Sequence, residues 1–217
     1  MEQQAGETGA SQGPADDGLA AAAASRMQET DVDRRAKLVG GHVLIGVSVF
    51  CLWAAADAWQ AVTQLGAAAF LSVLAAIPAG FVFGTLVHEW CHFAGARLSG
   101  ARYTVPSRFG LFVFDYDFRN NGLSQFFAMS YGGQAGSALA IVLLGIALPL
   151  DTAGRAMVLA SCVGAAVFGA MIEWPVLART RRSGDPVAEL AKIDKATLYR
   201  SATGASAATL LSWLLLG

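Results

Sequence analysis

The chain has 217 residues, of which 55% are hydrophobic and 14% are charged, and its formal net charge is -1. This balance is typical of an integral membrane protein and argues against a soluble globular domain. Because basic residues are not in excess and form no patch with aromatic ones, the composition also argues against a nucleic-acid partner.

The first segment, residues 1–36, is dominated by Gly, Ala, Gln, Asp and Glu and carries few large apolar side chains. Such a segment cannot bury enough apolar surface to fold alone, so we expect a disordered tail. It also lacks the basic start and leucine-rich stretch of a signal peptide. We expect residues 37–217 to form a polytopic membrane domain.

Apolar runs long enough to cross a bilayer as helices follow this tail. They predict five spans, at about 38–59, 67–97, 125–150, 156–178 and, shorter, 202–216. The expected fold is therefore an all-α membrane protein with about five transmembrane helices. Lys and Arg residues near the span ends favour an amino end in the cytoplasm, because only Arg155 then lies on the other side. This predicts a multi-pass protein of the cytoplasmic membrane.

The second span contains an H-E-x-x-H motif, His88-Glu89-Trp90-Cys91-His92. Residues four apart share one face of a helix, so His88 and His92 can bind one zinc ion, with Glu89 beside it as a candidate general base. Ionisable residues inside a span cost on the order of a few kcal/mol each and are usually functional. The alternative is a chance match, in which both histidines bond to backbone or water. Hydrolysis of an amide is the chemistry that the motif suits.

The loop after this span, residues 100–123, carries aromatic residues at every second position from Phe112 to Phe118. A period of two predicts a short β-strand or hairpin with one aromatic face. Two interpretations stay open. The aromatic side chains dip into the membrane interface, or the strand presents an edge that pairs with an unwound substrate segment.

A run of small residues, 130–138, opens the third span. Small residues let helix backbones approach closely in lipid, where packing drives association. The run also suits a helix that lies against the H-E-x-x-H helix and leaves space for substrate. Gln134, within it, can donate a hydrogen bond toward that space.

A catalytic zinc ion needs a third protein ligand besides the two histidines. Glu173 is the only acidic residue in the fourth span, and its spacing from Arg179 predicts a depth in the membrane similar to that of the histidines. Its alternative role is an ion pair with a neighbouring basic side chain. Asp185, beyond the end of that span, is the second candidate ligand, and His42 is the third.

These features resemble the intramembrane zinc metalloproteases of the site-2 protease family over about residues 67–182. The resemblance rests on H-E-W-C-H in one span, a strand-bearing loop and the Gly-rich segment 132–136 in the next span. It implies a three-helix catalytic core that hydrolyses peptide bonds in or near transmembrane segments of membrane-protein substrates. That family's usual third-ligand motif, N-x-x-P followed by D-G, is not found, and Glu173-Trp174-Pro175 stands in its place.

Two other functions stay open. A second family of membrane metalloproteases with H-E-x-x-H uses a glutamate from a later helix as third ligand, which Glu173 would suit. Its members carry an E-x-x-x-A-D pattern, whereas Glu173 is followed by Trp-Pro-Val-Leu. The third possibility is a non-proteolytic membrane adaptor or scaffold that keeps the helix core without the metal. Since no soluble specificity domain is visible, selection of a membrane-protein substrate falls to the membrane part, the 100–123 loop or an adaptor protein.

Overall fold

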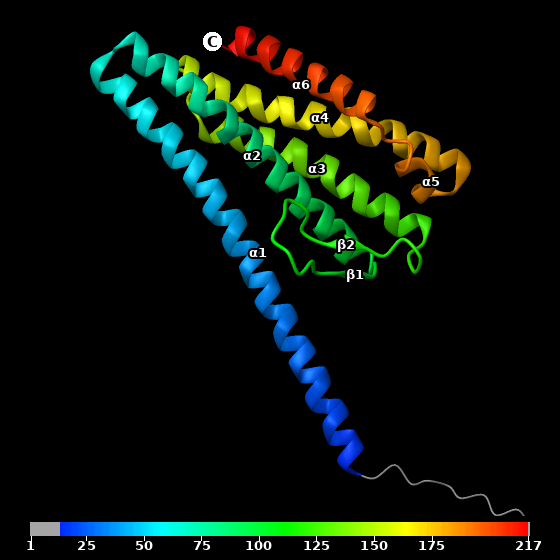
Figure 1. The fold of residues 1–217 in the computed structure, drawn as a ribbon. Helices are drawn as coiled ribbons and strands as arrows, with labels where there is room; N and C mark the ends of the chain where they lie inside the picture. Colours follow the sequence, from blue (N-terminus) through cyan, green and yellow to red (C-terminus); the bar gives the residue numbers. More distant parts are fainter. Residues whose placement is uncertain (1–13, 217) are drawn as a thin grey trace, which may run out of the picture.

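The computed structural model describes residues 14–216, and most of them are helical (Figure 1). The elements in chain order are α1 (Pro14–Thr63), α2 (Gly66–Leu98), β1 (Tyr103–Thr104), β2 (Asp115–Tyr116), α3 (Leu123–Ala147), α4 (Ala153–Ser183), α5 (Pro186–Leu190) and α6 (Lys195–Leu216). Helices therefore form the body of the molecule, and the two short strands lie in the connection between α2 and α3.

Four helices are long and apolar enough to cross a membrane: Val32–Thr63 within α1, and α2, α3 and α4. They fit a multi-pass membrane protein, as the sequence predicts. The expected fifth span, residues 202–216, is not confirmed. It belongs to α6, whose first half is rich in Ala, Ser, Thr and Gly and is therefore less apolar, and α6 lies along α4 (Figure 1).

The expected tail, residues 1–36, is described only in part. Residues 1–13 lie outside the described residues, and from Pro14 onward the chain forms the first part of α1. This part extends away from the other helices (Figure 1). Its alanine run has a high intrinsic propensity for helix, which is sufficient reason for a helical backbone there.

α2 is the central helix, since it contacts α1, α3 and α4. Small residues allow these contacts to be close. A Cβ added at Gly80 of α2 would overlap the backbone of Val158 in α4, and one added at Gly132 of α3 would overlap the backbone of Cys91 in α2. In lipid, close packing of this kind drives helix association. The H-E-x-x-H part of α2 therefore lies between α3 and α4.

The far end of the bundle is tied together by a buried acidic residue of α1. The guanidinium of Arg155 donates to Asp57 at 2.9 Å, and the hydroxyls of Ser72 and Thr152 donate to the same carboxylate at 3.4 and 3.2 Å. A buried charge is tolerated when it is paired and hydrogen-bonded, as Asp57 is. Arg155 is the one basic residue near a span end that the sequence places on the non-cytoplasmic side. Its ion pair with Asp57 joins α4 to α1.

The connection between α2 and α3 contains an antiparallel hairpin in which Tyr103 faces Tyr116. The hairpin is the one that the sequence predicts, but β2 covers only Asp115–Tyr116 and is shorter than the aromatic alternation. Ring contacts run from Phe114 through Tyr116 to Phe118. They continue to Phe93 on α2 at one end and to Phe126 on α3 at the other. The aromatic face thus packs the loop onto both helices.

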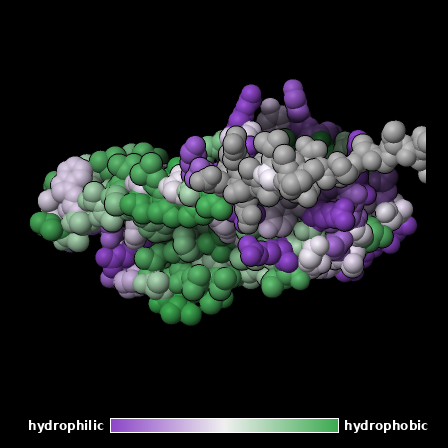
Figure 2. Space-filling model, turned by 90° about the horizontal axis from the view of Figure 1, so that it is seen from below, coloured by the Kyte–Doolittle hydropathy of each residue, from purple (hydrophilic) through white to green (hydrophobic). Residues whose placement is uncertain are grey.

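The outward faces of the spans are apolar. Large exposed hydrophobic side chains on them include Val43, Leu44, Val47, Leu52, Phe70, Leu74, Val142 and Ile146. Figure 2 shows hydrophobic residues gathered on the side of the molecule where α1 passes into α2, and hydrophilic residues gathered toward α5. Exposed apolar surface of this extent marks a face that contacts lipid or another protein.

Candidate metal centre

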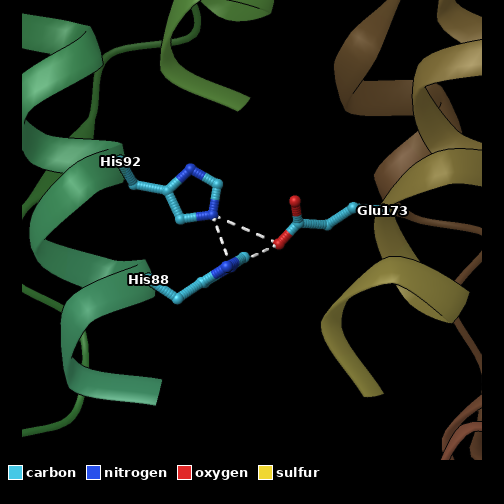
Figure 3. A group of neighbouring side chains, drawn as sticks. All are labelled: His88, His92 and Glu173. Carbon is cyan, nitrogen blue, oxygen red and sulfur yellow. Dashed lines mark hydrogen bonds and ion pairs between the residues drawn. The ribbon is translucent and has the colours of Figure 1, made fainter. Parts of the chain in front are cut away.

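Three side chains from two helices point toward one another. His88 and His92 lie one turn apart on α2, and Glu173 faces them from α4 (Figure 3). The Nε2 atoms of the two histidines are 2.9 Å apart. Oε1 of Glu173 lies 2.8 Å from Nε2 of His88 and 3.2 Å from Nε2 of His92. Ligand atoms around a tetrahedral zinc ion, with bonds of about 2.0–2.1 Å, are about 3.3 Å apart. The group is therefore close to the size that one zinc ion requires.

The outer nitrogen of each ring has its own partner. Nδ1 of His92 lies 2.9 Å from the carbonyl oxygen of Met129, which can only accept, so this nitrogen carries the proton. A neutral His92 therefore presents the lone pair of Nε2 to the centre. Nδ1 of His88 lies 2.9 Å from the hydroxyl of Ser137, which can accept in the same way. If both rings carry their protons on Nδ1, three acceptor atoms converge on one point, and a cation would stabilise this arrangement.

Gln134 of α3 orients the carboxylate. Its amide nitrogen donates to Oε2 of Glu173 at 2.7 Å, which leaves Oε1 toward the histidines. Its amide oxygen accepts from the indole nitrogen of Trp174 at 3.2 Å. The sequence suggests that Gln134 donates toward substrate, and in the structure it donates to Glu173.

Glu89 lines a cavity of about 300 Å³ together with His92 and Glu173. The remaining wall is mainly apolar, and the loop contributes Phe112, Phe114, Tyr116 and Phe118 to it. The volume lies at the lower end of the range for ligand-binding pockets. The cavity thus brings ionisable groups together with the aromatic side chains of the loop, which form much of its wall.

The other two candidate ligands are engaged elsewhere. Asp185 caps the start of α5, where its carboxylate accepts from the backbone N–H of Ala188 at 3.0 Å. His42 of α1 lies with Nε2 at 2.9 Å from the carbonyl oxygen of Gly110, and its Nδ1 accepts from the indole of Trp90 at 3.2 Å. Within the part of the chain that the structure describes, the group close enough to share an ion is His88, His92 and Glu173.

Two groups of the centre are not found by sequence reasoning. Ser137 lies in the run of small residues, and its spacing of seven from Ser130 puts both hydroxyls on one face of α3, which is a detectable signal. The carbonyl of Met129 leaves no signal, because every residue has one. Both serve to hold a histidine ring rather than to contact an ion.

The close approach of α3 to the histidines gives a testable prediction. A Cβ at Gly133 would overlap the ring of His92. Since that ring is held by the Met129 carbonyl, we expect Gly133→Ala to rotate or displace it and to weaken zinc binding about 10- to 100-fold, as loss of a ring's orientation typically does. Zinc affinity measured by competition with a chromogenic chelator checks this.

Gly145→Ala is the matched control, because it lies on the same helix and a Cβ there meets nothing within 4 Å. It should bind zinc as the parent does. If both alanine variants bind zinc equally well, the ring of His92 is not held against Gly133 as the geometry indicates.

Comparisons of the chain with protein-family models, with curated proteins and with solved structures find no match. The resemblance to the site-2 protease family therefore stays a prediction from the sequence, and the function is inferred from the geometry of the centre.

Proposed function

We propose that the chain is an intramembrane zinc metalloprotease that hydrolyses peptide bonds in or near the transmembrane segments of membrane-protein substrates. The observation that carries the proposal is the convergence of two imidazole nitrogens and one carboxylate oxygen from apolar helices beside Glu89 and a cavity. Ionisable groups are costly in a span, and here they are gathered at one point.

The donor set fits zinc. Two histidines and one glutamate, with the fourth position open, form a ligand set that catalytic zinc sites use. The hydrogen bonds from the rings to Met129 and Ser137, and from Gln134 to Glu173, are the outer contacts that orient such ligands. When bound, zinc would supply the Lewis acid that polarises a peptide carbonyl and eases the loss of a proton from water.

We assign the proton transfers to Glu89. It neighbours His88 but is not on the face that His88 and His92 share, so its carboxylate is free to act as a base. Glu89 takes a proton from water as the water oxygen bonds to the carbonyl carbon. It then gives this proton to the amide nitrogen as the carbon–nitrogen bond breaks, and the products are a carboxylate and an amine.

We propose that the substrate segment is held in extended form along β2. The N–H of Asp117 donates to the carbonyl of Arg102, and Tyr103 faces Tyr116. Hydrogen-bonded positions alternate in an antiparallel pair, so the N–H of Tyr116 points to the outer edge of β2. Tyr116 also lines the cavity. An unwound peptide could add to this edge as a further strand, with its side chains against the aromatic wall.

The proposal includes an amino end in the cytoplasm and residence in the cytoplasmic membrane. Basic residues gather at the end of α4 that carries Arg179, Arg181 and Arg182, close to Glu173 in the sequence. Lys and Arg are retained on the cytoplasmic side of membrane proteins. The centre then lies in the cytoplasmic half of the membrane.

One observation favours a second candidate, a non-proteolytic scaffold. If the Ser137 hydroxyl donates to Nδ1 of His88, the proton of that ring lies on Nε2 and can be donated to Glu173. The three side chains would then hold the helices together without an ion. The third candidate is a membrane metalloprotease of another H-E-x-x-H family that uses Glu173 as third ligand. Metal content separates the scaffold from both metalloproteases.

The experiment is a measurement of zinc in the purified full chain by elemental analysis, together with cleavage of a single-span reporter in vesicles. We expect about one zinc per chain. A chelator should stop cleavage, and added zinc should restore it. A chain that purifies without metal and takes up no zinc would support the scaffold and exclude the protease.

A further inference from the structure

A second cavity, of about 420 Å³, also lies against α4. Ile172 lines both this cavity and the one at the candidate metal centre. Part of its wall is apolar and comes from α4, where Met171, Ile172 and Pro175 lie in the apolar part of the span. The other part is cationic and contains Arg179, Lys192 and Arg200. The cavity is therefore amphipathic.

Two of the three cations are held in place by Glu189 of α5. Its buried carboxylate accepts from Nε of Arg179 at 2.8 Å and from Nζ of Lys192 at 2.8 Å. The hydrogen bond from Lys192 and that from Arg179 together hold the pKa of Glu189 below its ordinary value. The carboxylate thus stays ionised at neutral pH, and it fixes both cations at the wall of the cavity.

The remaining charges leave an excess of positive charge. Arg200 of α6 donates through Nε to the carbonyl of Ala196 at 3.3 Å, in its own helix. Asp194 also lines the cavity, but its Oδ1 accepts from both the backbone N–H and the hydroxyl of Thr197 at 2.7 Å. Three cations stand against the carboxylates of Glu189 and Asp194. One net positive charge therefore faces the cavity.

We propose that this cavity binds the phosphate of an anionic phospholipid. A phosphodiester carries one negative charge, which matches the excess, and guanidinium and ammonium groups are its usual partners. The acyl chain would lie along Met171 and Pro175, where the wall is apolar. Arg179 follows the apolar part of α4, so the cavity lies where headgroups lie, and basic residues at that depth attract anionic lipids. The proposal does not depend on proteolysis or on zinc.

The test uses the purified full chain in detergent and measures thermal unfolding with added phosphatidylglycerol, phosphatidylcholine or glycerol phosphate. At saturation we expect phosphatidylglycerol to raise the unfolding temperature by about 5 °C. Arg200→Gln should weaken the apparent affinity about fivefold. Lys195→Gln is the matched control, since Lys195 is an exposed cation of the same helix that does not line the cavity. It should bind as the parent does, and so should Arg200→Lys.

The outcomes that overturn the proposal are distinct. Equal affinity of the parent, Arg200→Gln and Lys195→Gln for phosphatidylglycerol would mean that the cavity is not the site. An equal shift with phosphatidylcholine would mean that the cavity does not distinguish an anionic headgroup from a zwitterionic one, which contradicts the proposal. The full shift with glycerol phosphate alone would assign the cavity to a soluble phosphate compound, not to a lipid. Native mass spectrometry of each variant with each lipid gives an independent count of bound molecules.

Discussion

Glu89→Gln is expected to abolish cleavage while zinc stays bound. Glutamine keeps the size of the side chain at the wall of the cavity but cannot take a proton at neutral pH. Loss of a general base lowers a rate about 10²- to 10⁴-fold, and an unactivated water deepens the loss. The measurement pairs the initial rate of reporter cleavage in vesicles with the zinc content of the same preparation.

Asp33→Asn is the control for Glu89→Gln, because it makes the same exchange of acid for amide at an exposed position of α1 that does not line the cavity. It should retain both zinc and cleavage. Should Glu89→Gln cleave at the parental rate with zinc present, Glu89 is not the base, and the protease mechanism proposed for this centre fails.

Glu173→Ala is expected to lose zinc and cleavage together. Its Oε1 is one of three atoms at the centre, and without it only two imidazoles remain, which do not hold a catalytic zinc ion. We expect the zinc content to fall below about a tenth of the parental value, since removing a ligand costs more than the roughly 10- to 100-fold lost with an outer hydrogen bond. His88→Ala should behave in the same way.

The matched control for Glu173→Ala is Asp185→Asn, which alters the other candidate carboxylate. Asn also caps a helix well, so α5 should keep its start. Full zinc content in Asp185→Asn together with loss in Glu173→Ala assigns the third ligand. The reverse pattern would make Asp185 the ligand and would require the segment after α4 to fold back toward the histidines.

The two variants also separate the candidate functions. A metalloprotease requires that Glu89→Gln keep zinc but lose cleavage, and that Glu173→Ala lose both. A scaffold held by hydrogen bonds would instead show no zinc in the parent and a lowered unfolding temperature in Glu173→Ala, because the contacts from Glu173 to His88 and Gln134 join α4 to α2 and α3.

The sequence by itself determined the features that depend on local periodicity. Apolar runs of sufficient length predicted the four helices that are long and apolar enough to cross a membrane. A helix suits this role because it satisfies its own backbone hydrogen bonds in lipid. The spacing of four placed His88 and His92 on one face of α2. The sequence did not settle whether α6 spans the membrane, because only the second half of that helix is strongly apolar. It also predicted a longer strand than β2, because alternating aromatic residues can form a packed face without extending a strand.

Only the tertiary structure decided what meets the two histidines. The depth of Glu173 along α4 was readable from its spacing to Arg179, but its rotation toward α2 depends on the small residues at which α2 packs against α4. The same packing brings Ser137 and Gln134 of α3 to the centre, and it leaves His42 between Trp90 and Gly110. These contacts join residues 37 to 85 positions apart in the chain, and no local pattern specifies which helix faces turn toward each other.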